Sequence, residues 1–256
     1  MMGIGLFYKG LGMKNLLDNE DTHLEYQRML PFFKRIYDSF LKLFPGFSTQ
    51  SPQSMIELYL LVSVVKPKTI FELGTGYRAS TLAMSLSANK LQSTPKMVSF
   101  DLKPRNFMEI VGSLSEIMGE ELNCAAVEDI QGNALEYNIP EEWEKPIFVF
   151  YDAHDTPKCE LFKYAIDLWF PKLKGQTVAV HDCSVTAKEF PITLSDHRLV
   201  RHFSGRYISG FYEVIPMTNW MNENRVDFSR PIDEIGGEKS SIIYFEIPIC
   251  GSENDR

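Results

Sequence analysis

The sequence predicts an α/β fold built on a doubly wound, mostly parallel sheet of about seven strands, with helices at its N-terminal side. Two observations lead to this prediction. Short apolar runs alternate with segments of helical periodicity between residues 69 and 182, and the runs are almost unbroken, as in strands buried on both faces. The chain has 256 residues, 44% of them hydrophobic, which suffices for one sizeable core. We therefore expect a single domain over residues 1–256.

Two helices are expected before the first strand, in an N-terminal helical cap over residues 20–66. Apolar residues recur at helical spacing from Phe33 to Phe44, where Pro45 ends the helix. Ser51 suits the N-cap of the next helix, which must end before Pro67 because of proline's backbone geometry. The apolar stripe of the first helix is expected to pack against the sheet or a second subunit.

The central part of the chain, residues 67–185, has the alternation of strands and helices typical of a Rossmann-like, cofactor-binding core. Helices are expected from about Ala79, from Phe107 to Met118, and from Leu161 to Trp169. The expected strands are TIFEL (69–73), MVSFD (97–101), LNCAAVE (122–128), IFVFYD (147–152) and TVAVHD (177–182). A doubly wound sheet of this kind binds ligands at the carboxyl ends of its strands.

Residues 186–250 are expected to form C-terminal strands and a substrate lid. RYISGFYEV (206–214) and SIIYFEI (241–247) read as two further strands with antiparallel pairing, and the polar stretch from 217 to 239 shows no clear helix. Aromatic residues in long loops over a crevice often contact a substrate. Trp220, Met221 and Phe228 therefore either face an acceptor or anchor the loop.

Composition and charge favour a small molecule as the partner. With 26 basic and 34 acidic residues the net charge is −8, which disfavours nucleic acid and anionic membrane surfaces. The four cysteines form no C-x-x-C pair, so the spacing does not support a zinc knuckle. The longest apolar run is far shorter than a membrane span, and the first residues do not read as a secretory signal. We expect a cytoplasmic protein. The sequence does not determine whether it forms a homo-oligomer.

A glycine-rich loop after the first strand and an acid after the second predict a nucleoside site. Gly74 and Gly76 let the backbone turn sharply and approach a ligand closely. Asp101, which lies 25 residues beyond Gly76, is placed to accept hydrogen bonds from ribose hydroxyls. The spacing Gly74-x-Gly76-x-x-Ala79 also satisfies the dinucleotide fingerprint in its G-x-G-x-x-A form.

Carboxylates at the strand ends favour a cationic nucleoside. Glu72, Asp152 and Asp182 each end a predicted strand, and they would repel the pyrophosphate of a dinucleotide. S-adenosylmethionine combines an adenosine with a positive sulfonium, so it fits the loop, the ribose acid and the acidic surroundings together. An NAD(P)-dependent dehydrogenase is the alternative, with Arg78 close to the expected phosphate position.

The segment ELGTGYRAS followed by SFDLKP resembles the first two motifs of class I S-adenosylmethionine-dependent methyltransferases, over roughly residues 50–185. The entry STQSPQSMIELYLLVSVVKPKTIFELGTGYRAS resembles small-molecule O-methyltransferases of the cation-dependent catechol and caffeoyl-CoA type and cephalosporin-hydroxylase-like relatives. This resemblance implies methyl transfer from S-adenosyl-L-methionine to an oxygen of a small-molecule acceptor. The implied cofactor-binding residues, in which Asn133 replaces a commoner acid, are Glu72, Gly74, Thr75, Gly76, Ser80, Asp101, Gly132, Asn133, Ala134 and Asp152.

The segments YDAHD and HDCS are similar to the paired segments that supply metal oxygens in the cation-dependent relatives. The resemblance thus implies that Asp152 and Asp182 hold a divalent cation such as Mg²⁺, although Cys183 stands where that pattern has asparagine. His154 or His181 would serve softer ions, or act as the base without metal. The expected catalytic residues are Asp152, His154, His181 and Asp182. A non-catalytic S-adenosylmethionine-binding module remains open, and the sequence does not name the acceptor.

Overall fold

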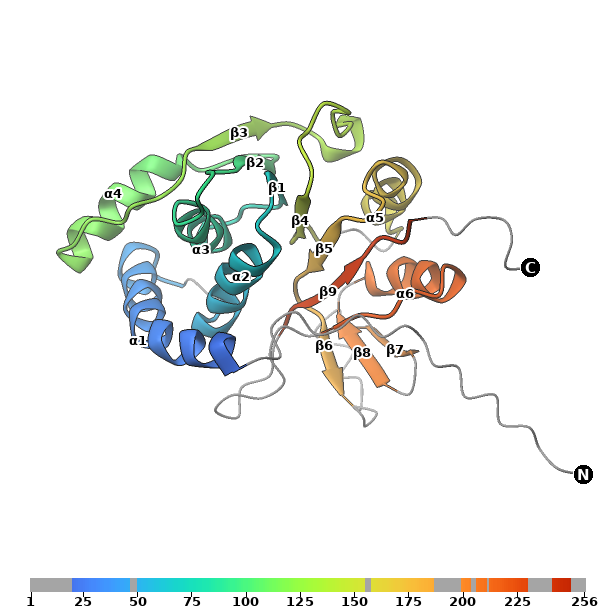
Figure 1. Ribbon diagram of the computed structural model, residues 1–256, viewed down its shortest axis with the longest axis horizontal. Helices are drawn as coiled ribbons and strands as arrows, with labels where there is room; N and C mark the ends of the chain where they lie inside the picture. Colours follow the sequence, from blue (N-terminus) through green and yellow to red (C-terminus); the bar gives the residue numbers. More distant parts are fainter. Residues whose placement is uncertain are drawn as a thin grey trace, which may run out of the picture.

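The computed structural model describes residues 20–46, 50–154, 158–186, 199–203, 206–210, 212–229 and 241–249. Its helices alternate with strands as the sequence predicts (Figure 1). The strands are β1 (Thr69–Leu73), β2 (Lys96–Asp101), β3 (Val127–Gln131), β4 (Ile147–Tyr151), β5 (Thr177–Val180), β6 (Ser184–Thr186), β7 (Leu199–Phe203), β8 (Arg206–Gly210) and β9 (Ile243–Glu246). The helices are α1 (Glu20–Leu43), α2 (Pro52–Val65), α3 (Ala79–Ala88), α4 (Phe107–Met118), α5 (Glu160–Tyr164) and α6 (Val214–Glu223), with short turns η1 (Ala134–Glu136), η2 (Ala165–Trp169) and η3 (Phe170–Lys172).

The main sheet has six described strands in the order β3-β2-β1-β4-β5-β9. Strands β1 to β5 run parallel and β9 pairs antiparallel with β5, which confirms the mostly parallel, doubly wound fold. The chain leaves β1 toward β2 on one side and returns to β4 on the other, so the strand order reverses between β1 and β4. A crevice forms at the carboxyl ends of strands at such a reversal, and this positions the site.

Two hydrophobic cores lie on the two faces of the sheet, because successive residues of a strand point to opposite faces. Ile70 belongs to the core beneath α1 to α4, and Phe71 belongs to the core beneath α5 and α6. In Figure 1 the first four helices lie to the left of the sheet and the last two to its right. The near-continuous apolar character of the strands follows from this double burial.

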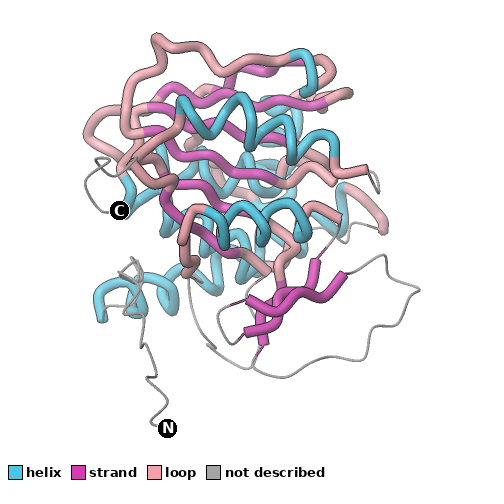
Figure 2. Tube along the Cα trace, turned by 90° about the vertical axis from the view of Figure 1, so that its right-hand side faces the viewer, coloured by secondary structure: helices cyan, strands magenta, loops and turns pink. Residues whose placement is uncertain are grey.

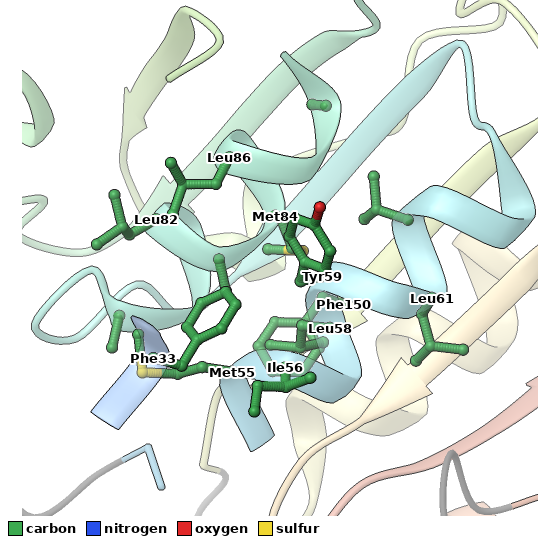
Figure 3. Packing of buried hydrophobic residues seen from close by; sticks show 14 of the residues in the cluster. Phe33, Met55, Ile56, Leu58, Tyr59, Leu61, Leu82, Met84, Leu86 and Phe150 are labelled. Atoms are coloured by element: carbon green, nitrogen blue, oxygen red, sulfur yellow. The ribbon is translucent and has the colours of Figure 1, made fainter. Parts of the chain in front are cut away.

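The N-terminal helices form as predicted. Ser51 caps α2 by accepting the Ser54 N–H, and Pro52 occupies the first turn. The stripe of α1 is buried at Phe33, Ile36 and Phe40 within the first core. Figure 3 shows Phe33 beside side chains of α2 and α3, so the stripe packs within this chain's own core.

Two elements of the core differ from the prediction. The third strand begins at Val127, five residues after the expected start, because the residues before it cross from α4 to the sheet. The segment from Glu160 to Lys172 is not one α-helix. It changes to a π-helical turn at Ala165 and a 3₁₀ turn at Phe170, where Pro171 follows.

The C-terminal region also differs in part. Both predicted strands pair antiparallel, but not with each other: β9 joins the main sheet, whereas β8 lies between β6 and β7 in a separate sheet (Figure 2). The prediction of no helix after Met217 is wrong, since α6 spans Val214–Glu223. Its periodic Val214, Met217 and Met221 are buried, and the polar residues between them obscured this pattern.

Trp220, Met221 and Phe228 act as anchors in the second core. Trp220 packs against Phe170 and Phe245 with ring centroids 4.7 and 5.9 Å away, and the other two side chains are buried. The rest of the expected lid falls largely outside the described residues. Within the described ranges no helix has the length and apolar character required to cross a membrane.

Candidate functional site

A cavity of about 670 Å³ opens at the carboxyl ends of β1, β2, β4 and β5. Its position is the one that the strand order predicts for a ligand. Of the residues expected from the sequence to bind the cofactor or a metal or to act in catalysis, all except Glu72 line it. These lining residues are Gly74, Thr75, Gly76, Ser80, Asp101, Gly132, Asn133, Ala134, Asp152, His154, His181 and Asp182.

The glycine loop after β1 needs its two glycines for different reasons. Gly74 has φ +83°, and a Cβ there would come within 2.5 Å of the carbonyl oxygen of Asp152. It therefore lets the ends of β1 and β4 meet. Gly76 has φ +46° and open space where its Cβ would lie, so a ligand can approach the backbone there.

Glu72 lies beneath the cavity. Its fully buried carboxylate accepts hydrogen bonds from Ser80 Oγ (2.6 Å), Thr81 Oγ1 (2.6 Å) and Ser99 Oγ (2.5 Å). Burial raises its pKa despite these three hydroxyls. The structure thus does not support the predicted direct contact with the cofactor. Glu72 instead ties the start of α3 to β1 and β2.

Asp101 fastens the glycine loop. One of its carboxylate oxygens accepts from both the N–H (2.8 Å) and the hydroxyl (3.0 Å) of Thr75, and the other accepts from the Lys103 N–H (2.8 Å). Burial alone would raise its pKa, but these hydrogen bonds, with one from the Gly76 N–H, lower it. They occupy most of the carboxylate's capacity to accept. A contact with ribose stays a prediction.

The far side of the cavity combines a turn with exposed apolar groups. Asn133 accepts from the Leu135 N–H (3.1 Å) and donates to Glu136 (3.2 Å), so its side chain caps the turn η1. Leu102 is 68% exposed and Leu135 is 37% exposed, and both line the cavity. No sequence motif indicates this pair, although an apolar residue directly after Asp101 is a usable signal. Such a pair suits the faces of a planar base.

Asp152 is held on both sides at the end of β4. Its Oδ1 lies 2.9 Å from His181 Nδ1, and its Oδ2 accepts from Gln50 Nε2 at 2.9 Å. The other ring nitrogen of His181, Nε2, lies 3.0 Å from Ser241 Oγ, and the residue is 4% exposed. With both ring nitrogens engaged inside the protein, His181 is poorly placed to take a proton from a ligand.

His154 bridges two acids at the opening. Its Nε2 lies 3.2 Å from Asp182 Oδ2 and its Nδ1 lies 3.5 Å from Glu213 Oε1. Hydrogen bonds to these two carboxylates raise the pKa of His154 to about 10, so at neutral pH it carries a positive charge. Asp182 itself has φ +56°, a conformation that few residues other than glycine adopt. An imidazolium does not suit the role of general base.

The electrostatics of the cavity favour cations. Four carboxylates line it, from Asp101, Asp152, Glu160 and Asp182, and no Lys or Arg does so among the described residues. Arg78, which the dehydrogenase alternative placed near a phosphate, is fully buried. Its guanidinium donates to the Arg105 carbonyl and to Asp129 (2.7 Å), so it does not face the cavity.

Asp152, His154 and Asp182 also form a candidate metal set, with one ligand atom from each within 4.8 Å of the others. Two carboxylates and one imidazole suit a divalent cation of intermediate softness. Cys183 is buried, and burial raises the pKa of its thiol well above the usual value. It is therefore a small core residue beside the site.

No protein-family model matches the chain, and no curated protein does. Solved structures with a similar fold include the O-methyltransferase TomG from Streptomyces achromogenes in complex with SAM, at 19% identity over 84% of this chain and 89% of that chain (TM-score 0.48). SAH-bound methyltransferase PaMTH1 from Podospora anserina shares 13% identity over 90% and 97% (TM-score 0.49). An O-methyltransferase from Bacillus cereus in complex with SAH shares 17% over 84% and 90% (TM-score 0.47).

Proposed function

We propose that this protein is an S-adenosylmethionine-dependent methyltransferase that transfers a methyl group to an oxygen of a small-molecule acceptor. The observation that carries the proposal is a cavity with a glycine loop and Asp101 at one end, acids at the other, and no lysine or arginine among its described lining residues. A nucleoside with an attached cation matches this arrangement. A cytoplasmic location and a partner other than nucleic acid or membrane remain predictions.

The charge of the lining argues against the dehydrogenase alternative. NAD(P) carries a pyrophosphate, which needs backbone donors at a helix N-terminus or nearby cations. Here Arg78 has positive φ at the start of α3 and its guanidinium is committed to Arg105 and Asp129. Asp101 and Asp152 at the cavity would repel the phosphates.

In the proposed complex the loop of Gly74 to Gly76 lies against the amino acid end of S-adenosylmethionine, and Asp101 against the ribose. The adenine is bounded by Leu102 and by Gly132 to Leu135, which line the far side. Asp152, which belongs to the acidic end and adjoins Gly74, accepts from the ammonium of the cofactor. The sulfonium methyl then faces the acidic end, where the acceptor binds.

Methyl transfer needs an acceptor oxygen in line with the methyl group and the sulfur. The oxygen forms a bond to the methyl carbon, the carbon–sulfur bond breaks with its electron pair going to sulfur, and the acceptor loses its hydroxyl proton. His154, held as a cation by Asp182 and Glu213, stabilises the negative charge that the oxygen gains as its proton leaves. Asp182, the more exposed of the two strand-end acids, takes the proton.

A divalent cation is a second proposal for the same end of the cavity, Mg²⁺ if the two carboxylates hold it and a softer ion such as Mn²⁺ if His154 joins them. Asp152, His154 and Asp182 would hold it, and their atoms are close enough together to do so. A bound cation would lower the pKa of the acceptor hydroxyl and orient its oxygen. His154 would then leave its ion pair with Asp182.

Isothermal titration tests which cofactor the protein binds. We expect the purified, ligand-free protein to bind S-adenosylhomocysteine and not NAD. Asp101→Asn should weaken binding of S-adenosylhomocysteine at least tenfold, because the amide cannot accept all the loop's donors. Asp167→Asn, at an exposed acid outside the cavity, is the matched control. Binding of NAD without S-adenosylhomocysteine would overturn the proposal.

Thermal denaturation tests whether a divalent cation binds at the acidic end of the cavity. If it binds, millimolar Mg²⁺ or Mn²⁺ should raise the melting temperature of the wild type, since a ligand of the native state stabilises it. Asp182→Asn should remove this increase, whereas Asp167→Asn should keep it. An equal response of wild type and Asp182→Asn to both ions would exclude this cation site. The same variants assayed for methyl transfer, once an acceptor is known, separate an enzyme from a non-catalytic binding module.

A further inference from the structure

Asp152 belongs to a ring of hydrogen-bonded side chains that extends beyond the cavity. Gln50 Nε2 donates to Asp152 Oδ2 (2.9 Å), and Asp152 Oδ1 lies 2.9 Å from His181 Nδ1. His181 Nε2 lies 3.0 Å from Ser241 Oγ, which lies 3.1 Å from Ser54 Oγ. Since Gln50 directly precedes the N-cap of α2 and Ser54 lies in its first turn, the ring closes through the backbone.

The distances within Asp152, His181 and Ser241 are those of a hydrolase triad, but the arrangement does not serve that chemistry. A nucleophile must face the substrate. Ser241 is absent from the described lining of the cavity, and its hydroxyl lies between His181 and Ser54. The only members of the ring that line the cavity are Gln50, Asp152 and His181.

The ring determines the orientation of Asp152. A carboxylate on a strand end can rotate about its side-chain torsions unless its oxygens are fixed. Gln50 fixes one oxygen directly, and the buried His181 ring fixes the other. The ring of His181 is fixed in turn by Ser241, which comes from the segment before β9 and receives support from α2 through Ser54.

We propose that Ser241, and Ser54 through it, are positioning residues for Asp152, which they hold in place through the His181 ring to receive the ammonium of the cofactor. This inference rests on the proposed function. It assigns a role in cofactor binding to two serines outside the cavity. Groups held by such outer hydrogen bonds lose binding strength when the support is removed.

Paired titrations with S-adenosylhomocysteine and 5′-methylthioadenosine test the inference, because the second compound lacks the amino acid end. Ser241→Ala should weaken S-adenosylhomocysteine binding about five- to tenfold and leave 5′-methylthioadenosine within about twofold. Ser54→Ala should give a smaller loss of the same kind, and it keeps the Ser54 N–H that Ser51 caps. Ser241→Thr keeps the hydroxyl and should restore binding.

Ser39→Ala is the matched control, since it removes a buried serine hydroxyl that donates to Arg35 O (2.8 Å) in α1, away from the cavity. It should change neither affinity. Long-range ¹H–¹⁵N spectra of histidine-labelled protein provide a readout independent of binding. The His181 ring nitrogen signals, assigned with His181→Gln, should shift in Ser241→Ala, return in Ser241→Thr and stay unchanged in Ser39→Ala.

The outcomes separate the two proposals. Wild type that binds neither compound defeats the proposed function and this inference with it. Wild type that binds S-adenosylhomocysteine while folded Ser241→Ala binds it equally well defeats the inference alone. An equal loss of both compounds also defeats it, because the effect then does not pass through Asp152. Should Ser241→Ala not fold, Ser54→Ala and Ser241→Thr decide by the same criteria.

Discussion

The two ends of the cavity are built in different ways. At the glycine end the hydrogen bonds of Glu72 and Asp101 stay within β1, the loop, α3 and β2, between residues 72 and 103. At the acidic end the partners of Asp152, His154 and His181 come from segments as far apart as Gln50, Glu213 and Ser241. One end is the product of a single βαβ unit, and the other depends on the packing of the whole chain.

The two ends should therefore respond differently to substitution. At the glycine end Glu72, Thr75 and Ser80 are buried, so a change there disturbs the core and the binding of cofactor together. The acidic end is partly open, with His154 at 44% and Asp182 at 23% side-chain exposure. Changes there should affect the ligand more than the stability, since exposed charges are solvated.

Gly74→Ala should have the largest effect. Its Cβ would meet the Asp152 carbonyl at 2.5 Å, and alanine disfavours φ +83°. We expect a loss of roughly 2–4 kcal/mol in the free energy of unfolding, measured by urea denaturation. Gly74 allows the ends of β1 and β4 to approach closely at the cavity. This variant should therefore also lose S-adenosylhomocysteine binding.

Gly76→Ala is its control, since the alanine Cβ there meets open space. We expect about 1 kcal/mol of destabilisation from the backbone conformation alone. The affinity for S-adenosylhomocysteine should fall more than this stability loss suggests, because the added carbon projects toward the ligand. Equal stability losses in the two variants would contradict the tight contact between the strand ends.

Glu72→Gln should have the next largest effect, a loss of roughly 1–3 kcal/mol in the free energy of unfolding. The reason is that an amide has one acceptor oxygen for three buried hydroxyl donors. Burial raises the pKa of Glu72 in the folded state, so the folded protein binds this proton more tightly than the unfolded chain. Glu72 therefore lowers stability as the pH rises from the ordinary carboxyl range through the raised pKa. The wild type thus loses the stabilisation that the protonated Glu72 gives to the folded state, whereas the variant, which has no carboxyl at this position, loses nothing.

The stability gap between wild type and Glu72→Gln should thus narrow with rising pH, which urea denaturation from about pH 4.5 upward measures. Ser113→Ala is a suitable control at an exposed hydroxyl of α4, and its difference from wild type should stay constant with pH. A gap that widens with pH would mean that the three hydroxyls outweigh burial and that the carboxylate is favoured in the fold.

The same difference between the ends explains what the sequence could predict. The loop of Gly74 to Gly76 and Asp101 are close in sequence and follow strands with clear apolar runs, so local patterns located them. Asp152 and Asp182 were also found, because the ends of parallel strands meet at one edge of the sheet. Tertiary packing was not needed for any of these positions.

Gln50, Glu213 and Ser241 could not be predicted in this way. Each is a polar residue outside the strand ends, and no local spacing distinguishes it from a solvated residue. Glu213 reaches the site through α6, a helix whose buried positions are separated by polar residues. The direct cofactor role expected of Glu72 stays a prediction that the described cavity lining does not support, because its partners, Ser80, Thr81 and Ser99, lie below the loop.

His154→Gln probes the acidic end. It should lower the free energy of unfolding by about 1 kcal/mol, less than Gly74→Ala does, although it leaves Glu213 buried without its imidazole partner. The partly exposed position of His154 limits the loss, as urea denaturation at neutral pH with chelator present would show. Its effect on methyl transfer should exceed its effect on stability, because a cation at the acceptor oxygen is removed. A stability loss as large as that of Gly74→Ala would break the distinction between the two ends.

Asn133→Asp should have the smallest effect, although it is a change in the cavity lining. The new carboxylate keeps an oxygen for the Leu135 N–H and so preserves the cap of η1, while the bond to Glu136 is replaced by repulsion between two exposed acids. We expect less than about 0.5 kcal/mol in stability and less than about threefold in S-adenosylhomocysteine affinity. Because Asn133 directs its side chain to its own turn, a tenfold change in affinity would show that the side chain turns to the adenine when the ligand binds.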